Sequence, residues 1–396
     1  MPVNGLSRPA AVAVFHVRRI ISPLIDIPIK DIRVIKPRIG GGFGGKQEIL
    51  LEDLCALLTK KTGKPVRIEY TRRQEFTSAR TRHQHYIHYK IGVKGDTVTA
   101  VELKLIGDTG AYGSHGLTVS MVGGFKGLTL YNAPDSRFIC DVVYTNTPPA
   151  GAYRGYGTMQ ELFALEVIME EIAEKLGLDV VEFKRKNWLK VGEPMHMAKK
   201  LGEGREGFDQ SLATSGLADC VSIGLKATDY YEKRKKYQKQ EGSIKRGIGM
   251  SIAMHGSGIA GLDMAAATLK MNDDGSFNLL LGATDIGTGS DTILAQIAAE
   301  VLGIPVSDLI VYSSDTDFTP FDKGAYASST TYISGGAVEK TALAVKKQIQ
   351  EHAALMLKWE KPQELELRDK KVFTPDGRSV SLKDVALRSM HQMNQH

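Results

Sequence analysis

Five glycines within six residues give this chain its clearest chemical signal. Residues 39–48 read Ile-Gly-Gly-Gly-Phe-Gly-Gly-Lys-Gln-Glu, between a strand-like run at 31–37 and a helix-like run at 49–62. Glycine lacks a Cβ atom, so the backbone can reach positive φ and bring its N–H groups close to a ligand. The start of a following helix would add a partial positive charge. The segment therefore predicts a binding site for an anion.

Two other interpretations of this glycine loop remain open. Residues 40–46 agree with most of the nucleotide-binding pattern GxxxxGK[ST], but position 47 is Gln and lacks the hydroxyl that would bind Mg²⁺. No apolar strand ending in Asp, which such enzymes also need, stands out downstream. The glycines could also form a tight turn that binds nothing.

Three further segments accompany the glycine loop. They are Gly-Ala-Tyr-Arg-Gly-Tyr-Gly at 151–157, Ala-Thr-Asp-Ile-Gly-Thr-Gly-Ser-Asp-Thr at 283–292 and Gly-Ala-Tyr-Ala-Ser-Ser-Thr-Thr at 324–331. Together, and in this order, the four segments resemble the molybdopterin-binding loops of the xanthine dehydrogenase and aldehyde oxidase family. The resemblance runs from about residue 15 to about residue 350.

The resemblance implies a pterin dithiolene cofactor that holds molybdenum without a protein ligand and ends in a phosphate or a dinucleotide, the cytosine form included. Such a cofactor is bound largely by main-chain amides. The Phe43 amide would face the molybdenum, and the forked donors of Arg154 would bond near the pterin. The implied cofactor-binding residues are Gly41, Gly42, Phe43, Gly44, Arg154, Ile286, Gly287, Thr288, Ala327, Ser328, Ser329, Thr330 and Thr331.

The family also implies a substrate pocket. Gln47 stands where purine-oxidising relatives often carry a glutamate, and Gly113 stands near their substrate-binding arginine. A glutamine can still donate and accept hydrogen bonds, so a purine or related heterocycle, or an aldehyde, remains compatible with the pocket. The implied substrate residues are Gln47, Tyr153, Tyr156, Ile252 and Ala253.

The sequence offers no catalytic residue of its own. In the family a glutamate in a Gly-Glu-Pro-like motif near the C-terminus acts as the general base, and this chain lacks that motif. We expect the base on a second molybdenum-domain chain, or the chain to be a truncated product, and we expect the isolated chain to be inactive. If it turned over substrate alone, Glu161 or Glu69 would be the candidates.

Composition indicates an ordinary globular protein. Of 396 residues, 42% are hydrophobic and 24% charged, and the formal net charge of +6 is spread without a basic stripe, so nucleic-acid binding is not expected. The sequence shows no signal peptide and no membrane span, which predicts a cytoplasmic protein. Cys55, Cys140 and Cys220 form no C-x-x-C pair that could hold an iron–sulfur cluster.

Electron transfer would therefore depend on partner chains. The family resemblance implies an iron–sulfur subunit and an FAD subunit, and with the second molybdenum-domain chain these would assemble as a dimer of heteromers. A small molecule is the expected substrate. A rival hypothesis is a non-catalytic assembly fragment that keeps the fold and binds no cofactor.

Histidines mark the start of one predicted strand. His83 and His85 share a strand face, which raises the hypothesis of a metal site, but no acidic or third histidine partner is evident. We expect these histidines to face solvent.

Periodicity predicts an α+β fold of two mixed domains, packed around a cofactor cleft. The domains would span 1–240 and 241–396, incomplete at the N- and C-terminal ends respectively. Predicted helices span 17–30, which ends in a turn, 49–62, 158–176, 211–240, 292–302 and 336–357. Predicted strands span 32–35, 66–70, 86–93, 98–105, 138–144, 246–254, 265–271, 277–281 and 309–312.

Overall fold

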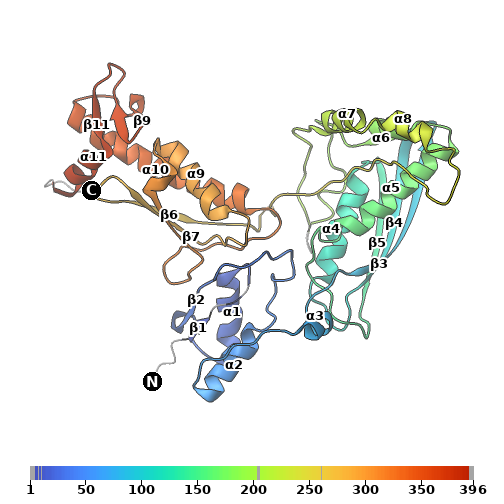
Figure 1. Ribbon diagram of the computed structural model, residues 1–396, viewed down its shortest axis with the longest axis horizontal. Coiled ribbons are helices and arrows are strands. Elements are labelled where there is room, and N and C mark those ends of the chain that lie inside the picture. The colour runs from blue at the N-terminus through green and yellow to red at the C-terminus, as the bar shows by residue number, and fades with distance from the viewer. Residues whose placement is uncertain (1–4, 8, 10, 203–205, 260, 392–396) are drawn as a thin grey trace. The chain divides into compact units, whose positions relative to one another are not determined.

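The computed structural model describes residues 5–7, 9, 11–202, 206–259 and 261–391. The chain forms two compact units that do not follow chain order (Figure 1): unit 1 comprises Met1–Tyr70 and Gly256–His396, and unit 2 comprises Thr71–His255. Helices and sheets mix in both units, so the predicted α+β class is confirmed. This division differs from the domain boundary proposed at 240–241, which stays a prediction.

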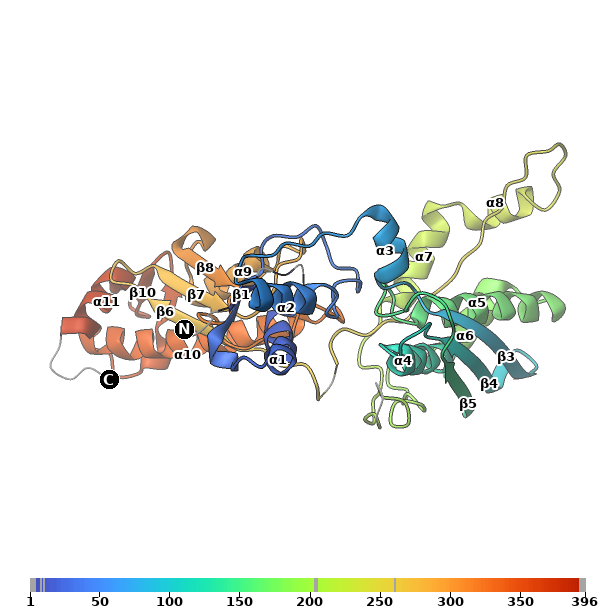
Figure 2. The ribbon, with the colours of Figure 1, turned by 90° about the horizontal axis from the view of Figure 1, so that it is seen from below.

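Unit 2 is built on one three-stranded sheet. β3 (Gln84–Lys94) pairs antiparallel with β4 (Thr97–Asp108), which pairs parallel with β5 (Asp135–Val143). Two helices, α4 (Gly116–Thr129) and α5 (Thr158–Lys175), cover one face of this sheet (Figure 2). Alternate residues of β4 point toward these helices and contribute to the core. The opposite face of the sheet is more exposed, as is common in sheets with antiparallel pairs.

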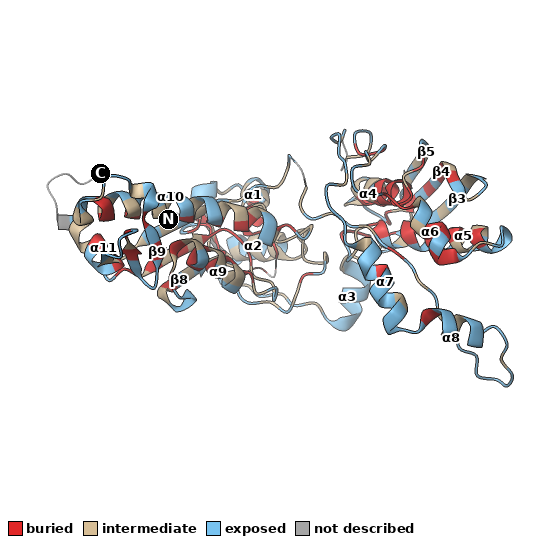
Figure 3. Cartoon of the chain, turned by 90° about the horizontal axis from the view of Figure 1, so that it is seen from above, coloured by how far each residue is buried: buried red, intermediate tan, exposed pale blue. Residues whose placement is uncertain are grey.

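The remaining helices of unit 2 are shorter. α6 (Val180–Asn187) packs beside α5, whereas α3, α7 and α8 are mostly exposed (Figure 3). The bounds of these three are Arg72–Ser78, Leu217–Ala227 and Tyr230–Lys236. The continuous helical run predicted at 211–240 is therefore two short helices.

The second half of unit 1 contains a similar small sheet. β6 (Ala267–Met271) pairs antiparallel with β7 (Phe277–Leu281), and β7 pairs parallel with β8 (Leu309–Ser313). A parallel pair needs a crossover, and α9 (Ser290–Leu302) supplies it. The long helix α10 (Thr330–Leu357) packs against α9 and β6, and β7, the central strand, buries its alternate residues.

A small C-terminal group packs at the far end of α10. It consists of an antiparallel sheet and a helix, namely β9 (Glu366–Arg368), β10 (Lys371–Phe373), β11 (Ser379–Ser381) and α11 (Leu382–His391).

The first seventy residues belong to the same unit as the C-terminal half. They contribute β1 (Gly5–Ser7), α1 (Val14–Ile25), β2 (Ile32–Val34) and α2 (Glu52–Thr62). The Arg33 guanidinium lies 2.5 Å from the Asp315 carboxylate, and Thr316 N donates to Val34 O at 3.0 Å. These bonds hold β2 against the residues that follow β8. Short 3₁₀ turns occur at Ile29–Asp31, Val306–Asp308 and Pro362–Glu364.

Two predicted strands are wrong. Residues 66–70 and 246–254 form no strand, although both lie within the described part of the chain. The helix α4 was not predicted at all, and α10 begins six residues before the predicted start at 336. None of the helices in the described ranges combines the length and hydropathy of a membrane span.

Candidate cofactor-binding and substrate loops

The first glycine loop of unit 1 has an unusual backbone. Gly41, Phe43 and Gly44 adopt φ values of 98°, 51° and 90°. Positive φ is uncommon for a phenylalanine, and Phe43 is 63% exposed. Turns of this kind direct successive N–H groups into one concavity that suits an anion.

Neighbouring segments hold this loop tightly in place. Val12 N donates to Lys46 O at 3.1 Å, and Val12 O accepts from Ala325 N at 3.0 Å. A Cβ atom on Gly42 would lie 2.7 Å from Val12 Cγ1 and 3.5 Å from Ile286 Cδ1. Val12 therefore ties the first loop to the loop at 324–331, while Gly42 brings it against the loop at 285–289. The structure thus brings together the three unit 1 loops that the sequence singled out.

The helix after the first loop begins later than predicted, and a carboxylate of the chain lies at its start. α2 begins at Glu52, three residues after the predicted start, and its own Glu52 carboxylate accepts hydrogen bonds from Leu50 N and Leu51 N at 2.9 and 3.1 Å. A nucleotide-binding P-loop requires its helix to begin at the lysine, which here is Lys46. The geometry therefore disfavours the nucleotide hypothesis.

The second loop already contains its own anion. The Asp285 carboxylate accepts hydrogen bonds from Gly287 N (2.8 Å), Gly289 N (3.3 Å) and Asp291 N (3.3 Å) at the start of α9. Burial alone would raise the pKa of Asp285, but these amides lower it below its ordinary value. The amide of Gly287, which was expected to face a cofactor, thus bonds within the chain, whereas Thr288 is exposed.

The third loop leads directly into α10. Ala327 and Ser328 adopt φ values of 49° and 53°, and Ala327 O accepts a hydrogen bond from Gly258 N at 2.8 Å. Thr330 and Thr331 lie in the first helical turn, whose amides have no acceptor within the helix. Among the described residues no side chain caps this helix start. Of the three helices near these loops, α10 offers the clearest free donors.

Two buried hydroxyl groups beside the second loop have no hydrogen-bond partner among the described residues. Thr284 and Ser290 are 1% and 3% exposed, and they flank the loop on either side. Buried polar groups are normally paired with protein, water or a ligand. Close-packed glycines, main-chain turns at positive φ and these hydroxyls fit a flat, polyanionic group bound through main-chain donors, such as a pterin cofactor.

In unit 2 the loop at 151–157 exposes Tyr153 and Arg154, whereas Tyr156 is half-buried. Tyr153 is 43% exposed and packs under the Arg82 guanidinium, 4.8 Å from the ring centroid, and Arg82 also donates to Arg154 O at 2.6 Å. The Arg154 side chain is exposed. Tyr156, at a φ of 46°, places its hydroxyl 2.5 Å from His115 Nδ1 and 2.8 Å from Thr118 Oγ1.

The predicted substrate residues lie in different environments. Gln47, in unit 1, is half-buried, and its N–H donates to Gly44 O at 3.1 Å. In unit 2, Ala253 is exposed, whereas Ile252 is 5% exposed and belongs to the hydrophobic core. Sequence reasoning missed Glu166 and Lys184, two buried charged residues that bind the main chain beside Ile252.

His83, which precedes β3, and His85 of β3 have buried side chains, contrary to prediction. His83 is 2% exposed and the His85 side chain is fully buried, with its Nδ1 atom 2.7 Å from Glu161 Oε1. Burial raises the pKa of Glu161, and the contact with His85 lowers it part of the way back. Glu161 is therefore enclosed in the core, and Glu69 is an exposed partner of Arg67. Neither glutamate has the setting of a general base at a substrate site.

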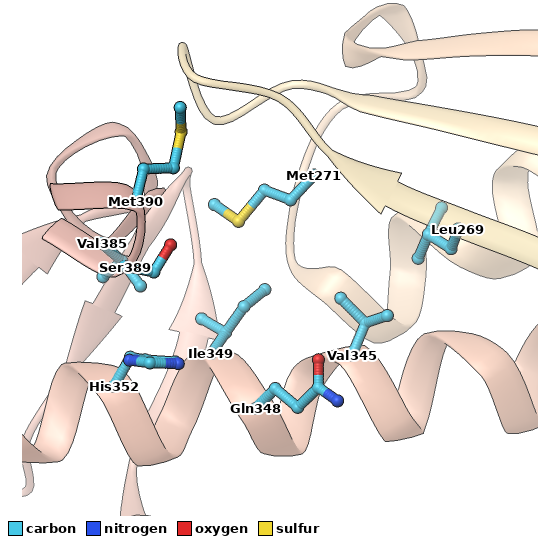
Figure 4. Close-up of a pocket in the computed structure, with 9 residues that line it drawn as sticks. All are labelled: Leu269, Met271, Val345, Gln348, Ile349, His352, Val385, Ser389 and Met390. Carbon is cyan, nitrogen blue, oxygen red and sulfur yellow. The ribbon is translucent and has the colours of Figure 1, made fainter. Parts of the chain in front are cut away.

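A cavity of about 450 Å³ lies elsewhere in unit 1 (Figure 4). Its walls come from β6, the second half of α10, and α11, and the α10 contribution begins at Val345. Along the helix that point lies roughly 22 Å from Thr330, at 1.5 Å per residue. The cavity is therefore separate from the glycine loops.

Comparison with known proteins agrees with these loops. Residues 10–188 and 224–395 match two family models, each described as a molybdopterin cofactor-binding domain. The xanthine dehydrogenase molybdenum-binding subunit of Escherichia coli O157:H7 is 39% identical over 346 residues, which cover 86% of this chain and 45% of that protein.

Solved structures show the same fold. Quinoline 2-oxidoreductase from Pseudomonas putida 86 aligns with a TM-score of 0.82 and 26% identity over 98% of this chain and 51% of that chain. Aldehyde oxidoreductase from Desulfovibrio gigas aligns with a TM-score of 0.75 and 27% identity over 85% of this chain and 36% of that chain.

The chain therefore belongs to the molybdopterin cofactor-binding family, and its relatives include xanthine dehydrogenase molybdenum-binding subunits. It spans about half the length of the curated relatives it matches.

Proposed function

We propose that this chain is the molybdenum-cofactor-binding part of a xanthine dehydrogenase-like hydroxylase. The enzyme would oxidise an electron-poor heterocycle, such as a purine, or an aldehyde, with water as the oxygen source. The observation that carries this proposal is the convergence of three loops in unit 1. Gly42 lies so close to Val12 and Ile286 that a Cβ atom added to it would be 2.7 Å from Val12 Cγ1. A family match without such loops would support only the fold.

In unit 1, main-chain donors would hold the cofactor. Gly41 to Gly44 would contribute amides on the pterin side, with Ile286, Gly287 and Thr288 beside them. The amide of Gly287 would contribute only if its bond to Asp285 opened. Residues 327–331 would bind the anionic end at the start of α10. The bound cofactor supplies two-electron oxidation chemistry.

In unit 2, side chains would contribute the remaining contacts. Arg154 would donate charge-assisted hydrogen bonds to the cofactor. Tyr153 and Tyr156 would border a flat substrate, and the hydroxyl of Tyr156 is already fixed by His115 and Thr118. Gln47, Ile252 and Ala253 remain proposed substrate residues.

Partner chains would complete the enzyme. We propose an iron–sulfur subunit and an FAD subunit that carry electrons away, and a further molybdenum-domain chain that supplies the glutamate base. The cytosine dinucleotide is one form of the cofactor that these partners could require. The assembly would be a cytoplasmic dimer of heteromers.

Co-expression with the neighbouring reading frames tests this proposal. We expect the assembled complex to contain molybdenum and pterin, and to hydroxylate a purine, a nicotinate-like heterocycle or an aldehyde with an artificial electron acceptor. A general base contributes about 10²–10⁴-fold to rate, so the cofactor-loaded chain alone should be slower by at least that factor. An empty site in the complex would favour the assembly-fragment hypothesis, and bound ATP with Mg²⁺ would favour a nucleotide enzyme.

A further inference from the structure

Residues 248–254 of unit 2 alternate like a strand but pair with none. Ile248, Met250, Ile252 and Met254 pack against the core, whereas the intervening residues 249, 251 and 253 are exposed. Main-chain N–H and C=O groups beside a core must still find partners. Here charged side chains take the place of a neighbouring strand.

The partners are a lysine and a glutamate from two adjacent helices. Lys184 of α6 donates from Nζ to Met250 O at 3.0 Å and to Glu166 Oε2 at 2.9 Å. Glu166 of α5 accepts from Ile252 N at 2.8 Å through the same oxygen. The Tyr131 hydroxyl donates to the other carboxylate oxygen.

Lys184 and Glu166 together form a clamp on this segment, and both side chains are buried. The Lys184 side chain is 0% exposed and the Glu166 side chain 8% exposed. Charge-assisted hydrogen bonds at such a site are shorter and stronger than neutral ones. Because they hold the C=O of residue 250 and the N–H of residue 252, they fix both the position and the register of this segment.

Register decides which side chains face outward. A slip of one residue in an extended segment exchanges its two faces. Here a slip would turn Ala253 into the core and expose Ile252, which replaces a small exposed surface with a large apolar one. The clamp therefore selects the outward face formed by residues 249, 251 and 253.

We propose that Glu166 and Lys184 are positioning residues that set the register of residues 250–253 and so the shape of the substrate pocket beside Ala253. This inference rests on the proposed function, because that function assigns Ala253 to the pocket. Ile252 then serves as the anchor in the core, and Ala253 as the wall presented to substrate.

A purely structural ion pair predicts a different outcome from a clamp. Replacing a buried ion pair by uncharged residues is often neutral for stability. Two uncharged double variants therefore separate the two roles. Glu166→Gln with Lys184→Met keeps an acceptor for Ile252 N, whereas Glu166→Leu with Lys184→Met removes it.

The first measurement is amide hydrogen exchange in peptides covering residues 247–255 of the full chain. We expect exchange at Ile252 to be at least about tenfold faster in the Leu/Met variant than in the Gln/Met variant. The matched control is Glu102→Leu with Arg137→Met, a partly exposed pair 3.2 Å apart in the same unit, which should leave this peptide unchanged. Equal exchange in the two test variants would overturn the clamp.

The second measurement is steady-state kinetics of the assembled enzyme. We expect the Leu/Met variant to raise KM for the heterocycle about tenfold while molybdenum content and kcat change little, and the Gln/Met variant to stay within about threefold of the parent. Faster exchange with an unchanged KM would overturn the proposal, since the pair would then only stabilise the fold. A parent complex without molybdenum or activity would overturn the proposed function and, with it, the proposed pocket. The exchange experiment by itself decides whether Glu166 and Lys184 fix the position of residues 250–253.

Discussion

The two units prepare their candidate loops by different physical means. In unit 1 the loops depend on the main chain: Gly41 and Gly44 adopt positive φ, and Gly42 leaves no room for a Cβ beside Val12. In unit 2 the segment at 250–253 depends instead on buried charges, because Glu166 and Lys184 bind its main chain beside Ile252. The unit 1 loops should therefore be sensitive to added side-chain volume, and the segment at 250–253 to the loss of a charge partner.

The largest effect should come from filling the glycine loop. Gly42→Val should abolish cofactor retention, because its Cβ would lie 2.7 Å from Val12 Cγ1, and Val12 is a stiff, buried side chain. Molybdenum per chain in the purified complex measures this. Gly40→Val is the matched control, since a Cβ there meets nothing within 4 Å and no positive φ is required. Undiminished metal in a folded Gly42→Val variant would show that this loop does not bind the cofactor.

The second effect concerns the stability of unit 2. Lys184→Met should lower the free energy of unfolding by about 3–5 kcal/mol, because it leaves the Glu166 carboxylate buried without its partner. Urea unfolding of the chain measures the loss, and adding Glu166→Gln should recover most of it. Lys104→Met removes a half-exposed lysine 3.6 Å from Glu102 and should cost about 0–1 kcal/mol. A loss no larger than that of the control would contradict the contrast between the units.

Local sequence signals predicted the strongest elements of the fold. α5 was predicted within one residue of its observed end because its apolar residues recur at helical spacing between Gly157 and Gly177. β7 was predicted at 277–281 as observed, because a short apolar run is bounded by turn residues. The unit 1 loops were likewise predicted from glycine and Ser/Thr runs.

Tertiary packing decided the rest. α4 was missed because its glycines lower helix propensity, yet they let other elements approach: a Cβ on Gly123 would lie 2.6 Å from Glu161 Oε2, and one on Gly127 would lie 2.3 Å from the Tyr89 hydroxyl. The strand predicted at 246–254 has the expected alternation, but its partners are side chains. No local pattern distinguishes Lys184 from an ordinary lysine on a helix surface.

The third effect tests the side-chain donor of unit 2. Arg154→Ala should weaken cofactor binding by about 1.5–3 kcal/mol, the range for a hydrogen bond to a charged group. Arg154→Lys should recover only part of this, because a lysine cannot form two parallel bonds. Cofactor release from the complex under dilution gives the affinity, and Arg73→Ala, an exposed arginine of α3, is the control. Equal retention by the alanine variant would make Arg154 a surface charge.

The smallest effect is a dependence on pH of the free energy of unfolding of unit 2. Burial raises the pKa of Glu161 above its ordinary value of 4.5 in the folded chain, where the carboxyl faces His85 of β3, with Tyr89 and Cys140 nearby. The folded state therefore holds this proton more tightly than the unfolded state, and stability falls as pH rises from about 4.5 through the raised pKa. Glu161→Gln cannot titrate, so its free energy of unfolding, measured in urea between about pH 4 and 8, should lack this part of the decline. Glu174→Gln, on the same helix but 66% exposed, should follow the parent. Parallel curves of unfolding free energy against pH for the parent and Glu161→Gln would mean that this carboxyl titrates alike in the folded and unfolded states. The pair of Glu161 and His85 would then have no electrostatic effect on the fold, unlike Glu166 and Lys184.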